Sequence, residues 1–186
     1  MKPVQFLPID LAEVTAGPSL HDGKPDPQAL ASFRRRLPHP HLDDFFSLYM
    51  QRYDELGRIP QKSEFGPHVL RAHLGYVGIA AMENGEEPLD VVIRLAGTRL
   101  VDFIGAELKG MSVRRLFRRP PEFVEKLWSP LFREARPRLD AGNLSPLDKP
   151  YVDYVALHVP LAAQDGRVRY AAFRAIFSLD GGKTWS

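Results

Sequence analysis

The sequence predicts one α+β domain, built on an antiparallel sheet of five strands with short helices packed against it. Two observations support this class. Two strand-like segments joined by a turn occupy the middle of the chain, and three more strand-like segments follow near its end. Helical periodicity is confined to the segments before and between these strands. Segregation of strands from helices is typical of α+β proteins.

The composition indicates one soluble domain with extensions. The 186 residues are 44% hydrophobic and 26% charged, enough to bury a sizeable core. A formal net charge of +2 gives no nucleic-acid signature. The absence of cysteine excludes disulfides, thiolate metal sites and cysteine nucleophiles, and it fits a reducing compartment. The first ten residues lack the apolar core of a secretion signal, and no apolar run could span a membrane, so we expect a cytoplasmic protein.

Residues 1–41 are expected to form an N-terminal extension that is partly irregular, because glycines and prolines recur throughout it. Within the extension, Asp26 can cap a short helix and Pro27 can open it. The arginines at 34–36 are interpreted as the solvated face of this helix, and an anionic partner is the alternative.

A stronger amphipathic helix is predicted for residues 42–57, where apolar side chains recur at steps of three and four until Gly57. Its aromatic surface exceeds what a surface helix needs, and burying it at about 25 cal/mol per Å² would contribute several kcal/mol. We therefore expect this face to pack on the sheet, on a second copy of the chain, or on both. The side chains proposed for contact with a second copy or another partner are Phe45, Phe46, Tyr49, Met50 and Tyr53.

The central segments predict a short helix followed by a strand pair. Pro67 can open the helix after a polar connection, because its missing N–H donor is not needed at the first helical position. Residues 76–82 and 90–96 are predicted to be antiparallel strands, with turn chemistry at Asn84-Gly85. In the second strand, apolar residues alternate between faces, which indicates a half-covered sheet.

Glycines interrupt the segment from Arg94 to Phe117, where the second strand leads into helices. Gly97 removes side-chain bulk at the corner, and Thr98 can cap a helix that Gly105 ends. A further glycine precedes a second short helix, for which Ser112 is the expected cap.

The last third of the chain predicts one helix and three strands. The helix spans about residues 122–136, between two prolines that start it and Pro137, which ends it. The strands cover 138–143, 151–161 and 168–179, and a Gln164-Asp165-Gly166 turn joins the last two.

Together these segments resemble the PAS-domain superfamily, and more narrowly the single-domain PAS proteins of proteobacteria. The resemblance covers about residues 45–179 and rests on short motifs that follow one another in a fixed order. The first are Arg58-Ile-Pro60, Glu64-Phe-Gly-Pro67 and the strand pair joined at Asn84-Gly85. They are followed by Ile93-Arg-Leu-Ala-Gly-Thr98, which leads to Gly105, Leu108 and Gly110, and by Val159-Pro-Leu161 before Asp165-Gly166. The long N-terminal extension and the proline-containing link from Asn143 to Tyr151 depart from the usual pattern. The resemblance implies a PAS-like domain over residues 42–182, followed by a tail of 183–186.

The resemblance also implies a cleft between the short helices and the sheet, where such folds hold ligands when they hold any. The residues expected to line it are Ile93, Leu95, Phe103, Met111, Phe132, Tyr154, His158 and Phe173. A solidly filled core is the alternative, because the apolar members of this set also pack well. The sequence requires no cofactor: haem ligation by His158 has no supporting feature, and the six histidines show no metal-ligand spacing.

No catalytic residue is predicted, because the sequence lacks a nucleophile elbow, a phosphate loop and a dinucleotide-binding turn. Two alternatives stay open. One is a cone-shaped α+β enzyme with an Asp/His cavity, for which Asp153 and His158 are the nearest pair. The other is weak nucleic-acid binding through Arg34–Arg36 and the arginines at 114, 115, 118 and 119, which would have to share a face.

The leading expectation is a stand-alone sensory or adaptor protein of signal transduction. No effector domain fits beside a PAS-like unit in 186 residues, so the output is expected to pass through contact with a protein partner of a signalling pathway. We expect a homodimer, with a small ligand in the cleft as a possible modulator, and we do not expect membrane or nucleic-acid binding.

Overall fold

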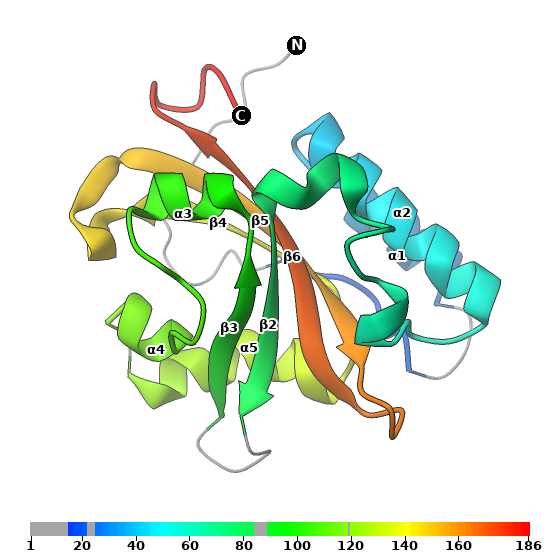
Figure 1. Ribbon diagram of the computed structural model, residues 1–186. Helices are drawn as coiled ribbons and strands as arrows, with labels where there is room; N and C mark the ends of the chain where they lie inside the picture. Colours follow the sequence, from blue (N-terminus) through cyan, green and yellow to red (C-terminus); the bar gives the residue numbers. More distant parts are fainter. Residues whose placement is uncertain (1–14, 22–24, 84–88, 119) are drawn as a thin grey trace.

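Antiparallel strands form one sheet, in the order β1-β4-β5-β6-β2-β3 (Figure 1). The computed structural model describes residues 15–21, 25–83, 89–118 and 120–186. Within these, the strands are β1 (Thr15–Ala16), β2 (Val77–Glu83), β3 (Asp90–Ala96), β4 (Arg138–Leu144), β5 (Lys149–Ala162) and β6 (Val168–Ser178). The predicted α+β class and antiparallel sheet are confirmed. The sequence did not indicate β1, a sixth strand that the N-terminal extension contributes beside β4.

The register of the sheet aligns one row of residues across four strands. Arg138 on β4 lies opposite His158 on β5, and His158 lies opposite Phe173 on β6. Phe173 in turn lies opposite Gly78 on β2. Side chains of directly opposed residues leave the sheet on the same face, so this central row places a guanidinium, an imidazole and a phenyl ring side by side.

The helices cover both faces of the sheet (Figure 1). The helix α2 (Pro40–Leu56) packs on one face, where the Tyr49 hydroxyl donates to the Pro160 carbonyl at 2.9 Å, and α1 (Pro27–Arg34) packs on α2 through Phe33 and Phe46. The opposite face carries α3 (Thr98–Ile104), α4 (Val113–Leu116) and α5 (Pro121–Arg133). Short 3-10 turns complete the described chain: η2 (Lys62–Glu64), η3 (Arg71–Tyr76) and η4 (Ser145–Leu147).

The start of α1 and the end of α2 follow the sequence prediction, whereas α2 begins at Pro40, two residues before the predicted start at 42. Asp26 caps α1 by accepting hydrogen bonds from the backbone N–H groups of Gln28 and Ala29, and Pro27 is the first helical residue. Gly57 ends α2 in the left-handed conformation, with φ of 65°. These two helix ends are therefore determined by residues at the ends themselves and do not depend on tertiary packing.

The aromatic face of α2 packs inside the monomer. Phe45, Phe46, Tyr49 and Tyr53 are all buried, with Phe45 and Tyr49 each packed edge-on against Phe65. These four side chains were proposed for contact with a second copy, but packing on β5, β6 and α1 removes them from the surface. The predicted homodimer stays a prediction, and of the proposed contact residues only Met50 is half-buried rather than buried.

Other local differences have identifiable causes. Pro67 begins no helix: residues 67–69 form a turn, and the helical segment is the 3-10 turn η3. The helix α5 ends three residues before the predicted Arg136, because Ala135 adopts a positive φ of 49°. The Ser112 side chain does not cap α4 but donates to Asp90 at 2.7 Å. The predicted Asn84-Gly85 turn lies outside the described residues.

The corner after β3 depends on Gly97, which is itself the N-cap residue of α3 in place of Thr98. A Cβ at this position would overlap the backbone carbonyls of Leu74 and Gly75, so only glycine lets η3 pass this closely. The predicted role of Gly97, to remove side-chain bulk at the corner, is confirmed.

Candidate functional site

A cavity of about 300 Å³ lies between the sheet and α3, α4 and α5. Its wall from the sheet includes residues of β3, β4, β5 and β6, and the connection between β4 and β5 also lines it. Most lining side chains are apolar. They include Ile93, Leu100, Leu108, Leu116, Phe123, Leu127, Trp128, Leu144, Ala156, Phe173, Ala175 and Phe177.

Four of the residues that the sequence predicted for this cleft line the cavity: Ile93, Tyr154, His158 and Phe173. The last three share one face of the hairpin formed by β5 and β6, as the alternation of the strands requires. The predicted cleft is thus present between the expected elements.

The other four predicted residues do not line the cavity. Leu95 is 40% exposed, because it lies near the end of the edge strand β3. Phe103 stacks on Phe177, with ring centroids 4.3 Å apart, and Phe132 stacks on Trp128. Met111 lies in the turn before α4, where its carbonyl accepts a hydrogen bond from the N–H of Ile93. These side chains therefore contact other parts of the core or the solvent. Strand and helix periodicity predicts the face on which a residue lies, but not which neighbour its side chain contacts.

The sequence prediction missed three residues that build the polar end of the cavity: Arg138, Asp140 and Trp128. Arg138 and Asp140 are two positions apart on β4, so they share a face, and that face is the one carrying His158. The available signal was the Arg-x-Asp alternation in a strand predicted to pair with the strand of His158. It was overlooked because charged residues in a short strand normally face solvent.

Arg138 connects the sheet to α5. Its guanidinium donates to the Leu127 carbonyl of α5 and, at 3.0 Å, to the carboxylate of Asp140. The same group lies over the Trp128 ring, with its Cζ atom 4.3 Å from the ring centroid. The side chain is only 2% exposed, so these contacts are made out of water.

His158 completes the cluster. Its Nε2 lies 3.1 Å from Oδ1 of Asp140, and its side chain is 6% exposed. The imidazole stacks on Phe173 and lies perpendicular to the Trp128 ring, with ring centroids 5.4 Å and 4.9 Å away. We refer to Arg138, Asp140 and His158 as the polar cluster of the cavity.

Burial and neighbouring charges decide which side chains of the polar cluster are ionised. Burial lowers the pKa of His158, and nearby Arg138 lowers it further, which outweighs the opposing effect of Asp140. Burial alone would raise the pKa of Asp140, but the positive Arg138 and the neighbouring His158 outweigh burial and lower it. At neutral pH the cluster therefore holds one positive guanidinium, one carboxylate and a neutral imidazole.

Several buried atoms of the polar cluster lack hydrogen-bond partners among the described residues. They are Nε of Arg138, Oδ1 of Asp140 and both ring nitrogens of His158. Nε2 and Oδ1 approach to 3.1 Å, but their alignment does not meet hydrogen-bond geometry. Leaving such groups unsatisfied in the interior costs on the order of 1–3 kcal/mol each, and these four atoms are enclosed by the protein on all sides.

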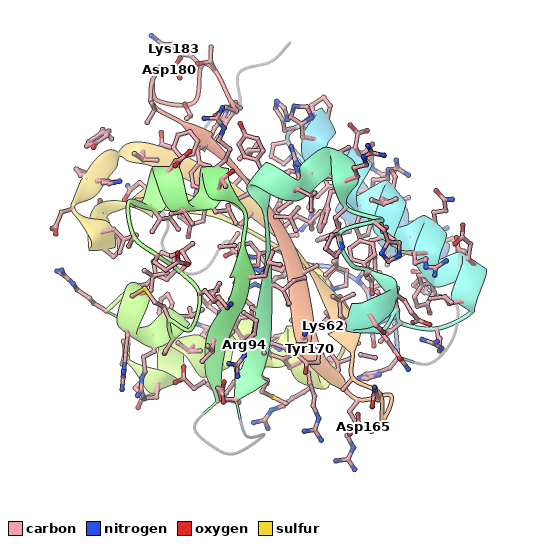
Figure 2. The ribbon with its side chains drawn as sticks, viewed as in Figure 1. Lys62, Arg94, Asp165, Tyr170, Asp180 and Lys183 are labelled. Carbon is pink, nitrogen blue, oxygen red and sulfur yellow. The ribbon has the colours of Figure 1, made fainter. Side chains whose placement is uncertain are left out.

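Two arginines on strands, Arg174 and Arg94, lie away from the cavity. Arg174 of β6 is buried on the opposite face, where it donates to His73 of η3 at 2.8 Å and lies over the Tyr76 ring. Arg94 lies on the edge strand β3 and forms an ion pair with Glu83 (Figure 2). Figure 2 also shows Lys62 close to the Tyr170 ring, a cation–π contact of 5.0 Å outside the cavity.

The structure changes the two alternatives drawn from the sequence. His158 lines the cavity and Asp153 does not, so the acid beside His158 is Asp140.

The arginines of α1 and α4 do not share a face, because Figure 1 shows these helices on opposite sides of the sheet. Arg34 is moreover paired with Asp43. Arg119 lies outside the described residues.

His158 is not placed to hold a haem. Asp140 faces its Nε2, aromatic rings pack against the imidazole, and a cavity of about 300 Å³ is at the lower end of ligand pockets. Among the residues that the structure describes, no group of three or more His, Cys, Asp or Glu side chains could hold a metal ion. No helix in the described part of the chain is long and apolar enough to cross a bilayer.

The comparison with family models points to one family. A family model described as "PAS domain" matches residues 38–170. A search of curated proteins finds no match. A sensory box sensor histidine kinase from Vibrio cholerae is 11% identical, with a TM-score of 0.40, over 76% of this chain and 98% of that one. The sensor region of another sensor histidine kinase is 15% identical, with a TM-score of 0.40, over 87% of this chain and 62% of that one.

Proposed function

The chain belongs to the PAS-domain family, and we propose that it is a sensory module whose signal is a small molecule bound in the cavity. Membership of this family supports a sensory role in signal transduction, and PAS domains mediate signalling interactions. In this proposal the bound molecule changes how α3, α4 and α5 lie on the sheet, and a protein partner recognises the change.

One observation carries the proposal: a cavity with mostly apolar walls is also lined by the polar residues Arg138, Asp140 and His158. Its volume of about 300 Å³ lies at the lower end of the range for ligand pockets. Ligand pockets commonly combine such apolar walls with a few polar groups that fix the orientation of the ligand. A filled core would instead bring apolar side chains into this space and leave no reason to bury the polar cluster there.

The experiment is to measure retention and binding of small molecules by the full chain. Native mass spectrometry of the purified protein, followed by isothermal titration with a metabolite panel, is expected to detect a bound species. Ala156→Phe places a ring into the cavity, because Ala156 lines it, and is expected to abolish binding. Ala31→Phe, on the exposed surface of α1, is the matched control and should bind like the wild type. Binding that Ala156→Phe leaves intact, or no binding by the wild type, would contradict the proposal.

A second candidate, a proton-transfer enzyme, is favoured by one contact. Asp140 faces Nε2 of His158 in the cavity, as an acid that orients a histidine base does. However, Asp140 also holds Arg138, and PAS domains are typically not enzymes. Incubation of the protein with carbon acids in deuterated water separates the candidates. Deuterium incorporation that His158→Phe abolishes would favour the enzyme, and its absence would favour the sensor.

The partner and the assembly are also part of this proposal. We propose a cytoplasmic homodimer that contacts a further signalling protein, as the sequence led us to expect. Because Phe45, Phe46, Tyr49 and Tyr53 are buried, the proposal now assigns the contact to the exposed side of α2, which carries Asp44, Gln51 and Asp54 and is bordered by the half-buried Met50. Sedimentation velocity over a range of protein concentrations tests it, and a monomer at every concentration would exclude the dimer.

A further inference from the structure

A buried arginine lies on the face of the sheet away from the cavity, and its hydrogen-bond partner is a histidine. Arg174 of β6 is 3% exposed, and within the described residues its guanidinium is paired with no carboxylate. Its Nη1 instead donates to Nδ1 of His73 at 2.8 Å, and its Cζ lies 5.3 Å from the centroid of the Tyr76 ring. Both partners belong to η3, so the neutral side chains of one short turn hold a buried positive charge.

The hydrogen bond from Arg174 determines the protonation state of His73. A guanidinium can only donate, so Nδ1 accepts and the imidazole is neutral, with its proton on Nε2. A second proton would remove the acceptor and would place a positive ring against the positive guanidinium. His73 is 8% exposed, so it keeps contact with solvent and can take up a proton from it. Protonation of His73 and the contact between η3 and β6 therefore oppose each other.

The groups around His73 also disfavour its protonation. Burial lowers the pKa of His73, Arg174 and His41 lower it further, and together these effects outweigh the exposed Asp44. Further titratable and charged groups on the surrounding elements are His39 at the start of α2, Arg71 and Tyr76 of η3, and Arg99 of α3, which pairs with Asp102. At neutral pH these surroundings favour the uncharged imidazole.

The η3 turn also connects this site to the cavity. The backbone carbonyls of Leu74 and Gly75 lie so close to Gly97 that a Cβ there would overlap them. Gly97 is the N-cap residue of α3, and α3 supplies Leu100 and Ile104 to the cavity wall. Movement of η3 away from β6 would therefore remove packing that supports the first turn of this helix.

We propose that His73 is a pH-dependent latch: in its neutral form it holds η3 on β6 through Arg174, and its protonation releases η3. The proton is then a second signal, which acts on the face of the sheet away from the cavity and reaches the cavity wall through α3. The latch is closed at neutral pH and opens as the pH falls below about 6.5, the ordinary histidine pKa, because the open form takes up a proton that the closed form resists. This inference goes beyond the proposed function and does not depend on a ligand in the cavity.

Native-state hydrogen exchange of the full chain at pH 7.5, 6.5 and 5.5 measures the opening of η3, after correction for the intrinsic exchange rates. The His73 amide, which donates to the Leu70 carbonyl at 2.7 Å, is the probe in η3. Its protection is expected to fall by up to about tenfold per pH unit below about 6.5. The Val101 amide, which donates to the Gly97 carbonyl, should lose protection with it. Amides of the central strand β5 should be better protected than both at every pH, because the opening is local.

His73→Gln separates the hydrogen bond from the titration, because its side-chain oxygen can accept from Arg174 but cannot take up a proton at these pH values. The protection of η3 in this variant is expected to change by less than about twofold between pH 7.5 and 5.5. His68→Gln removes an exposed histidine from the neighbouring turn and is the matched control, which should behave like the wild type. His158→Phe should keep the pH dependence of η3, since His158 lies on the cavity side of the sheet.

Imidazole ¹⁵N NMR of the wild type gives a second readout that needs no variant. It should show the proton of neutral His73 on Nε2 and a titration midpoint below about 6.5. A proton on Nδ1, or a midpoint at or above that value, would overturn the latch. So would a pH dependence of η3 that persists in His73→Gln, or exchange of η3 at the same rate as β5. None of these outcomes bears on ligand binding in the cavity, so failure of the latch and failure of the proposed function are distinguishable.

Discussion

The ring of Phe173 lies over Gly78, its opposed residue on β2, and occupies the space that a Cβ at position 78 would need. The missing side chain lets the ring lie flat against the sheet and stack on His158. One glycine on a strand thus helps to set the position of an aromatic wall of the cavity.

Gly78→Ala is expected to destabilise the fold by about 1–3 kcal/mol, because the added methyl displaces the Phe173 ring from its place. Urea unfolding followed by circular dichroism measures the change. Gly66→Ala is the matched control, since a Cβ there meets the His68 ring at an ordinary 3.6 Å, and its effect should be below about 0.5 kcal/mol. The double variant with Phe173→Leu should recover part of the loss. Equal effects of the two alanines would contradict the assignment.

Arg138→Met is expected to cost about 3–5 kcal/mol of folding stability, because it leaves the Asp140 carboxylate buried without its partner. Arg169→Met, on the exposed part of β6, removes only a surface ion pair with Asp165 and should cost less than about 1 kcal/mol. Adding Asp140→Leu to Arg138→Met should restore most of the stability, since the unpaired charge is gone. Thermal unfolding of the four proteins tests this, and failure of the double variant to recover would show that packing against Trp128 matters more than charge.

Stability is expected to fall as the pH decreases below about 6.5, the ordinary histidine pKa. The pKa of buried His158 is lowered, so the unfolded chain takes up a proton at a pH where the folded protein does not. The stabilisation from neutral His158 is complete above 6.5 and is lost by up to about 1.4 kcal/mol per pH unit as the pH falls toward the folded pKa.

The pKa of Asp140 is also lowered, but its contribution is lost only below the ordinary aspartate range and so does not affect this window. Urea titrations at pH 7.5, 6.5 and 5.5 measure the slope, and His158→Phe should reduce it. A stability that is constant or rises on acidification would contradict a neutral, buried His158.

Phe46→Glu is expected to destabilise the monomer by about 3–5 kcal/mol, whatever the assembly, because it buries an unpaired charge between α1, α2 and the sheet. It is therefore a poor test of dimerisation. Met50 is only half-buried at the border of the core, so Met50→Glu should cost clearly less stability than Phe46→Glu. Comparing the two by unfolding and sedimentation separates folding from assembly, and a stable, monomeric Phe46→Glu protein would show that its ring is not buried.

The sequence was a good guide wherever local chemistry decides the structure. Asp26, Pro27 and Gly57 act at helix ends through their own backbone or side chain, and the sequence placed all three correctly. The sheet was also largely predictable, because alternation and turn residues carry its signal. β1 was not, since a strand of two residues has no periodicity and exists only because β4 offers it an edge.

The site was predicted only in part, for a reason of geometry. Ile93, Tyr154, His158 and Phe173 face the cavity as alternation required, whereas Phe103 and Phe132 turn toward aromatic neighbours on other elements. Arg138 and Asp140 were missed because their burial depends on α5, which lies over them through Leu127 and Trp128. Whether a charged residue on a strand is buried depends on the helix that covers that face of the sheet. The local sequence of the strand does not indicate which helix does so.

The segment that the family comparison matches is smaller than the structure that forms the cavity. Residues 38–170 leave out β1, α1 and most of β6, from residue 171 onward. A fragment cut at those limits would lose Phe173, Ala175 and Phe177 from the cavity wall, Phe33 from its packing on Phe46, and the Tyr53 hydrogen bond to Leu20. Fragments meant for ligand screening or crystallisation therefore need to start before β1 and to extend past β6.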